Sequence, residues 1–231
     1  MTSLKDYIRR YTTIPAMLDI LRRKELPLLN PESWDDRNDR YFMARYKEAR
    51  GIEALYALCA AQCSETYHHW RVFTAGDSGA CLELYRQPLE DALDELEDVR
   101  YGSIDYLKLE DVEALTAQDV ARLPFVKRQQ FEPEKEYRII LESESAQAPA
   151  LSIELPVKLV GRVYLNPWLP ASIAETVKET VHSIPGCKGL SVQRSLLIES
   201  SRWKAAGDRV IGRPTARAKE TLKLKFKRKL A

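Results

Sequence analysis

The sequence predicts an α+β fold: one mixed domain with a central, mostly antiparallel sheet flanked by helices, and a basic C-terminal tail. Helix-like and strand-like segments occur together along the 231 residues, and neither an internal repeat nor a Gly/Ser linker divides them. This length suits one large domain or two small ones. We therefore expect one globular domain over residues 1–211, followed by a basic tail or terminal strand over residues 212–231.

The predicted helices are marked by caps, proline and apolar residues at helical spacing. Ser3 and Asp6 have the spacing of a helix start, with Ser3 as the cap. Pro15 lies at the second position of the next predicted helix, over residues 14–24, where a proline is well tolerated. Ile173, Val177 and Val181 are expected on the buried side of the last helix. In chain order, further helices are predicted over residues 14–24, 40–60 with a break near Gly51, 65–71, 88–98, 105–122 and 171–184.

The predicted strands are short apolar or alternating segments between turn residues. Residues 80–85 show the alternation of a half-buried strand. The segment 143–149 is expected to be a hairpin loop, and 30–36 a polar turn anchored by Trp34. Extended segments are predicted at 26–29, 60–64, 80–85, 137–141, 151–155, 159–165 and 190–198.

Composition indicates an intracellular globular protein. No apolar run reaches the roughly 18 residues that a membrane span needs, and the N-terminus has no apolar stretch typical of a secretory signal. We expect a cytoplasmic protein without a membrane partner. The four cysteines fit reduced thiols better than a disulfide framework, and neither they nor the three histidines have zinc-ligand spacing, so no metal site is predicted.

Charge is distributed unevenly along the chain. Residues 212–231 hold eight Lys/Arg and one acid, whereas residues 1–211 carry a net charge of −5. Tails of this kind often contact nucleic acid, and they also serve as solvated tails or fold back on an acidic body. The candidate nucleic-acid-binding residues are Lys223, Lys225, Lys227, Arg228 and Lys229.

The stretch 125–138, FVKRQQFEPEKEYR, is the sharpest candidate site. It places many charged residues directly before an apolar strand, which would fix their direction. Glu134 and Glu136 lie two apart at the strand entrance and are expected on one face, where mutual repulsion would keep one protonated as an acid or base. The alternative is structural: an edge strand whose glutamates pair with Lys127 or Arg138.

Other residues of this stretch and of two upstream segments complete the predicted site. Lys127, Arg128 and Arg138 suit a phosphate, and a structural salt bridge for Arg138 is the alternative. His69 is the candidate base or sugar-hydroxyl partner in the only histidine cluster. Its neighbour Trp70 is a candidate substrate contact or a core residue. The oxygen-rich segment 34–39 lacks the pattern of a calcium loop, so Asp36 is a candidate substrate contact or a helix cap.

Three ordered blocks resemble the bacterial domain-of-unknown-function family 2971. The first is Leu28-Leu29-Asn30-Pro31 with Trp34-Asp35-Asp36, the second Cys63-Ser64 with Trp70 and the strand from Gly79 to Leu84, and the third runs from Lys127 to Arg138. A late Ser195-x-x-Ile198 with Trp203-Lys204 is similar too. The resemblance covers roughly residues 5 to 204. It departs from the family pattern at residues 37–39 and 74–75. It implies a bacterial or phage protein, with a toxin or phage-defence setting, and no stated activity.

The Glu-x-Glu before a strand also looks like the acidic motif of ADP-ribosyltransferases. In that family a glutamate braces the nicotinamide ribose of NAD while the glycosidic bond breaks. The resemblance implies an enzyme acting on a nucleotide or nucleic acid, with NAD as its cofactor and Glu136, Glu134 and His69 as catalytic candidates. Two alternatives remain: a module that binds nucleic acid or a protein partner through its basic tail, and a purely structural accessory protein.

Overall fold

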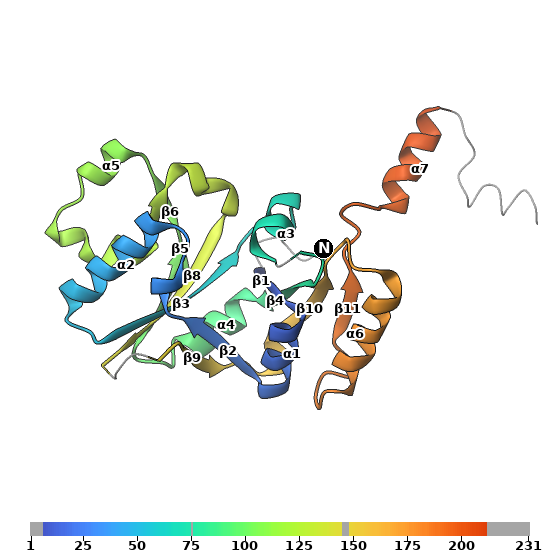
Figure 1. Ribbon diagram of the computed structural model, residues 1–231, viewed down its shortest axis with the longest axis horizontal. Coiled ribbons are helices and arrows are strands. Elements are labelled where there is room, and N and C mark those ends of the chain that lie inside the picture. Colours follow the sequence, from blue (N-terminus) through green and yellow to red (C-terminus); the bar gives the residue numbers. More distant parts are fainter. Residues whose placement is uncertain (1–6, 75, 145–147, 212–231) are drawn as a thin grey trace, which may run out of the picture. The chain divides into compact units, whose positions relative to one another are not determined.

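The computed structural model describes residues 7–74, 76–144 and 148–211, shown in colour in Figure 1. The chain divides into two compact units, residues 1–194 and 195–231. The described part of the second unit contains the helix α7 (Ser201–Val210). The predicted boundary at residue 211 stays a prediction, because the basic segment 212–231 lies outside the described residues.

The first unit is built on one large sheet. Its strands are β1 (Tyr7–Thr13), β2 (Glu25–Leu29), β3 (Ala54–Ala61), β4 (Gly79–Tyr85), β5 (Val99–Ser103), β8 (Glu136–Ser143), β9 (Ala150–Glu154), β10 (Val160–Leu165) and β11 (Ser191–Arg194). They follow the order β11-β10-β4-β1-β3-β2-β9, and β8 pairs with β3 and β5. Only β10 and β11 pair in parallel; the other pairs of this sheet are antiparallel. The predicted fold class is confirmed.

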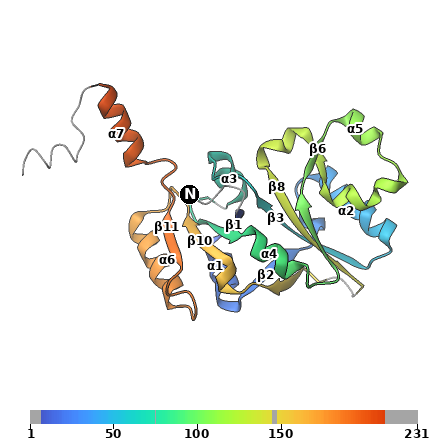
Figure 2. The same cartoon turned by 180° about the vertical axis from the view of Figure 1, so that it is seen from behind.

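Helices cover both faces of this sheet. They are α1 (Ile14–Arg23), α2 (Arg37–Arg50), α3 (Tyr67–Phe73), α4 (Arg86–Leu93), α5 (Leu109–Glu113) and α6 (Ala171–Ser183). The main apolar core joins α1, α4 and α6 to one face. On the other face α2 packs around Tyr46, and α3 packs around Trp70. Both views show α6 beside β10 and β11, and α2 with α5 at the end of the unit that carries β8 (Figures 1 and 2).

Alternation along β3 explains the two cores. Leu58 and Ala60 belong to the main core, whereas Ala57 and Ala61 face the clusters beneath α2 and α3. Successive residues of a strand point to opposite faces, so a strand covered on both sides has few polar positions.

Side-chain caps begin three of the helices. Thr13 caps α1, Asp36 caps α2 and Thr66 caps α3, each by accepting a backbone N–H of the first turn. Gly51 ends α2 in the left-handed conformation at φ 66°, which costs a glycine little.

A short parallel pair, β6 (Asp105–Leu107) and β7 (Val126–Arg128), stands apart from the main sheet. The 3₁₀ segments η3 (Ala117–Phe125) and η4 (Gln129–Glu134) flank β7. This region carries the residues that close one side of the site.

Several predicted elements are wrong. The helix expected from Ser3 is a strand from Tyr7 onward, and Ser3 itself lies outside the described residues. The end of the helix expected over 40–60 is β3, and residues 105–107 form β6 rather than a helix. These segments form strands because sheet partners on both sides or a parallel neighbour override the local spacing.

Three further expectations about position are also corrected. The segment 143–149, of which residues 145–147 lie outside the described part, is no hairpin loop, because β9 pairs with β2 and not with β8. Strand β8 is not an edge strand, since β3 and β5 flank it. Ile173 is 48% exposed, and Ala174 takes its expected place in the core with Val177 and Val181.

Candidate functional site

Five ionisable side chains from four elements converge where β8 begins. They are Asp39 of α2, Lys127 of β7, Glu134 at the end of η4, and Glu136 and Arg138 of β8. Glu136 and Arg138 are two residues apart in a strand, so both face α2. If all five are ionised, three carboxylates face two cations and one negative charge is in excess.

Arg138 is the centre of this cluster. Its side chain is fully buried, and its guanidinium lies 4.8 Å from the centre of the Trp34 ring. The two terminal nitrogens donate to the two carboxylate oxygens of Asp39 at 2.9 and 2.7 Å, and Nε donates to Glu136 at 2.8 Å. The remaining donors reach the carbonyl of Pro124 and Glu136.

All five donors of Arg138 are therefore used within the protein. The expectation that Arg138 binds a substrate or phosphate is not what this geometry supports: the structural salt bridge, its alternative, is present. The residue holds two carboxylates in place. Burial alone would lower the pKa of Arg138, but Glu136 and Asp39 raise it well above its usual value.

Lys127 bridges the two glutamates. Its Nζ lies 2.6 Å from Glu134 and 3.2 Å from Glu136, and 3.8 Å from Asp39. Burial alone would lower the pKa of Lys127, but Glu136 and Glu134 raise it above its usual range. The ammonium group therefore stays charged and links the carboxylates to the pocket that Lys127 lines.

The two glutamates differ in acidity. Burial raises the pKa of Glu134 above its usual value, and Lys127 only partly opposes this. Burial also acts on Glu136, but Arg138 and Lys127 outweigh it and lower its pKa to about 2. Two neighbouring carboxyl groups whose environments push their pKa values apart can take different roles in acid–base chemistry.

The backbone that carries this pair is held at three successive carbonyls. His69 Nε2 lies 2.8 Å from the carbonyl of Glu134, and Gln62 donates to the carbonyls of Lys135 and Glu136 at 2.8 and 3.3 Å. Lys135 has a positive φ of 46°, an uncommon conformation that these contacts help to fix. The segment 62–69 thus helps to hold the backbone that carries both carboxylates.

His69 is fully buried, and its geometry fixes one tautomer. A carbonyl can only accept, so Nε2 carries the proton, and Nδ1 accepts from the Thr66 hydroxyl at 2.5 Å. Burial lowers the pKa of His69, which favours this neutral form. The predicted role as catalytic base is not supported, because both ring nitrogens bind protein groups; His69 positions Glu134.

The other predicted contacts fall in different places. Trp70 is 1% exposed and packs in the core beneath α3, with its Nε1 donating to Glu65, so the core interpretation holds. Asp36 caps α2 as expected and also lines a pocket, and its Oδ2 is buried with no hydrogen-bond partner among the described groups. The basic candidates, Lys223, Lys225, Lys227, Arg228 and Lys229, lie outside the described residues.

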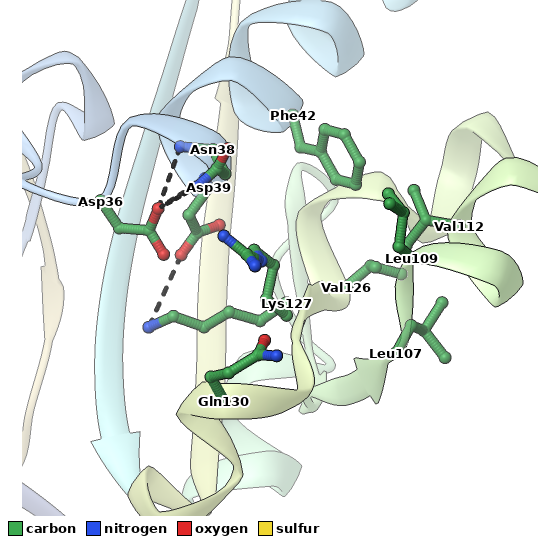
Figure 3. Close-up of a pocket in the computed structure, with 11 residues that line it drawn as sticks. Asp36, Asn38, Asp39, Phe42, Leu107, Leu109, Val112, Val126, Lys127 and Gln130 are labelled. Carbon is green, nitrogen blue, oxygen red and sulfur yellow. Dashed lines mark hydrogen bonds and ion pairs between the residues drawn. The ribbon is translucent and has the colours of Figure 1, made fainter.

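A pocket of about 400 Å³ opens beside the cluster. Figure 3 shows its polar side, with Asp36, Asn38, Asp39, Lys127 and Gln130, and its apolar side, with Phe42, Leu107, Leu109, Val112 and Val126. Arg128 completes the lining. Its exposed guanidinium makes no ion pair or hydrogen bond with the residues described here. A volume of this size and a mixed lining are typical of sites for small molecules.

The sequence did not identify the apolar wall or Asp39. The wall comes from α2, β6, α5 and β7, and no motif links these segments. Asp39 lies in the first turn of α2, but its contact with Arg138 depends on how α2 lies over β8.

Metal ligands do not gather in the part of the chain that the structure describes: it contains no group of three His, Cys, Asp or Glu that could hold an ion. All four cysteines are free, and Cys59 lies against Glu136. Within the same residues, no helix is long and apolar enough to span a membrane.

Comparison with known proteins gives structural neighbours only. No protein-family profile and no curated protein sequence matches the chain. Among solved structures, Thermus sp. 2.9 DarT in complex with NAD+ is 12% identical, with a TM-score of 0.44 over 84% of this chain and 98% of that one. DarT in complex with ADP-ribosylated ssDNA has 12% identity and a TM-score of 0.45, over 84% and 96% of the two chains. Similarity at this level decides nothing about the chemistry of the site, which follows from its own residues.

Proposed function

We propose that the chain is an enzyme that binds an NAD-type nucleotide and acts at its glycosidic bond, as an ADP-ribosyltransferase-like enzyme does. The observation that carries this proposal is the pair of unequal glutamates bridged by Lys127, which itself lines the pocket together with Asp39. Such chemistry needs one carboxylate that stays ionised beside a cationic sugar centre and a second that can accept a proton.

Glu136 suits the first role. Its low pKa keeps it ionised at every physiological pH, and Arg138 and Lys127 hold its two oxygens. With all five groups ionised, the excess negative charge of the cluster favours a positive charge developing on a bound ribose. Glu134 suits the second role, because a carboxylate with a raised pKa accepts a proton from an attacking hydroxyl more readily.

The pocket supports a nucleotide as the substrate. Its apolar wall, with Phe42, suits the face of a planar ring. Arg128 offers an unengaged guanidinium, which suits a phosphate bidentately. NAD would supply the bond that breaks: nicotinamide leaves with the bonding electrons, and the ribose carbon is taken by an acceptor whose proton passes to Glu134.

The direct test is nicotinamide release from NAD by the full-length chain, measured by chromatography. Wild type should release it, and Glu136→Gln should lower the rate about 100-fold, as for loss of one electrostatic contact to a transition state. Glu132→Gln is the matched control, since Glu132 is half-exposed, pairs only with Lys135 and lies in the same η4 segment. Absence of turnover by wild type, or equal rates for wild type and Glu136→Gln, would contradict the proposal.

We also propose that the chain belongs to domain-of-unknown-function family 2971. The meeting of the three blocks in space supports this. Trp34 of the first block lies against Arg138 of the third, and the segment 62–69, around the start of the second, holds the carbonyls of Glu134 and Glu136. A shared site would explain why one chain carries all three blocks although they lie far apart in the sequence.

A further inference from the structure

A second surface with a distinct chemistry lies on α3 and the end of β10. Tyr67 is 58% exposed, and Arg71, one helical turn later, is exposed as well. The guanidinium of Arg71 lies 3.7 Å from the centre of the Trp168 ring and 5.4 Å from that of Tyr67. We call Tyr67, Arg71 and Trp168 the stacking triad.

The guanidinium of Arg71 lies over the Trp168 ring, whereas the two aromatic rings are nearly perpendicular, at 84°. Tyr67 and Trp168 meet edge to face at 5.4 Å between ring centres. Arg71 Nε donates to the Tyr67 hydroxyl, while its two terminal nitrogens have no partner among the described residues. Exposed planar groups and unused guanidinium donors remain available at the surface.

Further groups of the same kind surround the triad. Tyr164 and Trp168 both pack on the cluster that contains Trp70, so β10 continues the surface of α3. Arg162 stacks on Tyr164 at 5.5 Å and donates to its hydroxyl. His68 and Phe73 of α3 are also exposed.

We infer that this surface binds the unpaired bases of a single-stranded nucleic acid. Bases stack on aromatic rings and on guanidinium planes, and Arg donors reach the phosphates between them. Two arginines in the patch match a polyanion, and the same chain carries eight Lys/Arg in residues 212–231. Aromatic and Arg side chains also serve in protein interfaces, which the experiment below separates.

The stacking triad shares no residue with the lining of the pocket, so binding of a strand there does not require the proposed enzymatic activity. Glu136→Gln is expected to bind the same strand as wild type does. Failure of the proposed function and failure of this inference are therefore distinguishable.

The chain contains a matched control pair. Tyr41 and Arg45 of α2 have the same spacing, Tyr41 is 57% exposed, and Arg45 lies 5.3 Å from its ring. This pair has no tryptophan layer beneath it, so it tests whether any exposed Tyr–Arg pair acts alike.

The experiment is fluorescence anisotropy of labelled 12-nucleotide dT and rU strands with the full-length chain at two salt concentrations. Tyr67→Ala should weaken binding about tenfold, the cost of one lost base stack, and Arg71→Gln should reduce the salt dependence. Trp168→Phe keeps an aromatic layer and should lose less than Trp168→Ala. Tyr41→Ala should bind as wild type does.

Two results would overturn the inference. One is binding by Tyr67→Ala and Trp168→Ala that equals wild type, which would assign all affinity to other basic residues. The other is no affinity of wild type for either strand, which would leave a protein partner as the occupant of this surface.

Discussion

At the scale of single residues, the site depends on one buried guanidinium and one ammonium that hold three carboxylates. The sequence predicted most of this group, because Lys127, Glu134, Glu136 and Arg138 lie within twelve residues and precede an apolar strand. It could not predict Asp39, which reaches Arg138 across 99 positions of sequence. That contact depends on how α2 lies over β8, which no local pattern contains.

Asp39→Asn should destabilise the protein by about 3–5 kcal/mol, because it leaves Arg138 buried without its bidentate partner. Urea unfolding measures the change. Asp19→Asn is the control: Asp19 pairs with Arg23 at the same 2.7 Å, but both side chains are more than half exposed. Little loss of stability is expected there, because solvent screens the exposed pair. Similar losses in the two variants would mean that burial of the Arg138 pair contributes little.

Glu136 should make stability depend on acid pH. Its folded-state pKa of about 2 is below that of an unfolded glutamate, so its contribution is fully present above about pH 4.3 and is lost as the pH falls towards 2. Unfolding free energies of wild type should fall in this window, and those of Glu136→Gln should fall less. If the unfolding free energies of wild type and Glu136→Gln fall equally with pH, the lowered pKa of Glu136 is contradicted.

At the scale of elements, the sequence predicted α1, α2, β8, β9 and β10, whereas the helix expected from Ser3 is strand β1 from Tyr7 onward. Helix α1 begins after Thr13 and α2 ends at Gly51, and β8, β9 and β10 lie where apolar runs were seen. Strand β3 was missed because it is buried on both faces, and its Ala- and Leu-rich sequence favours helix. Strand β1 contains a buried charged residue, Arg9, which forms an ion pair with Glu83.

The contact between α3 and β4 gives a prediction for an element. A Cβ on Gly79 would stand 2.5 Å from Cβ of Thr74, whose hydroxyl donates to the carbonyl of Trp70 at 2.5 Å and so cannot turn away freely. Gly79→Ala should therefore cost about 1–3 kcal/mol in urea unfolding. Gly189→Ala, with open space around it, should change stability little. Equal stability of the two variants would show that α3 moves away from β4 without cost.

At the scale of the whole molecule, composition predicted an acidic body and a basic end, and the fold keeps the described site within residues 1–194. The order of the three family-like blocks did not show whether they meet in space; in the structure Trp34 of the first block lies against Arg138 of the third. The sequence could not predict the pocket wall, because its residues come from segments that meet only when β6 and β7 pair beside α2.

Removal of residues 212–231 should weaken binding of single-stranded nucleic acid and flatten its salt dependence, because up to eight Lys/Arg are lost. The unfolding of the body should not change. Anisotropy titrations between 50 and 200 mM salt, for full-length and shortened chains, measure the effect. Equal salt slopes would show that the tail does not contact the strand.

Glu134 and Glu136 differ in acidity because of the groups around them, and their proposed roles depend on this difference. The most direct measurement is the NMR titration of the two side-chain carboxyl carbons in the full-length chain between pH 3 and 8. Glu136 is expected to stay ionised throughout, whereas Glu134 is expected to titrate at a pH above its usual pKa. If both carboxyl groups titrate near the usual pKa of a glutamate, the difference in acidity is absent. The division of roles proposed for the two glutamates is then wrong as well.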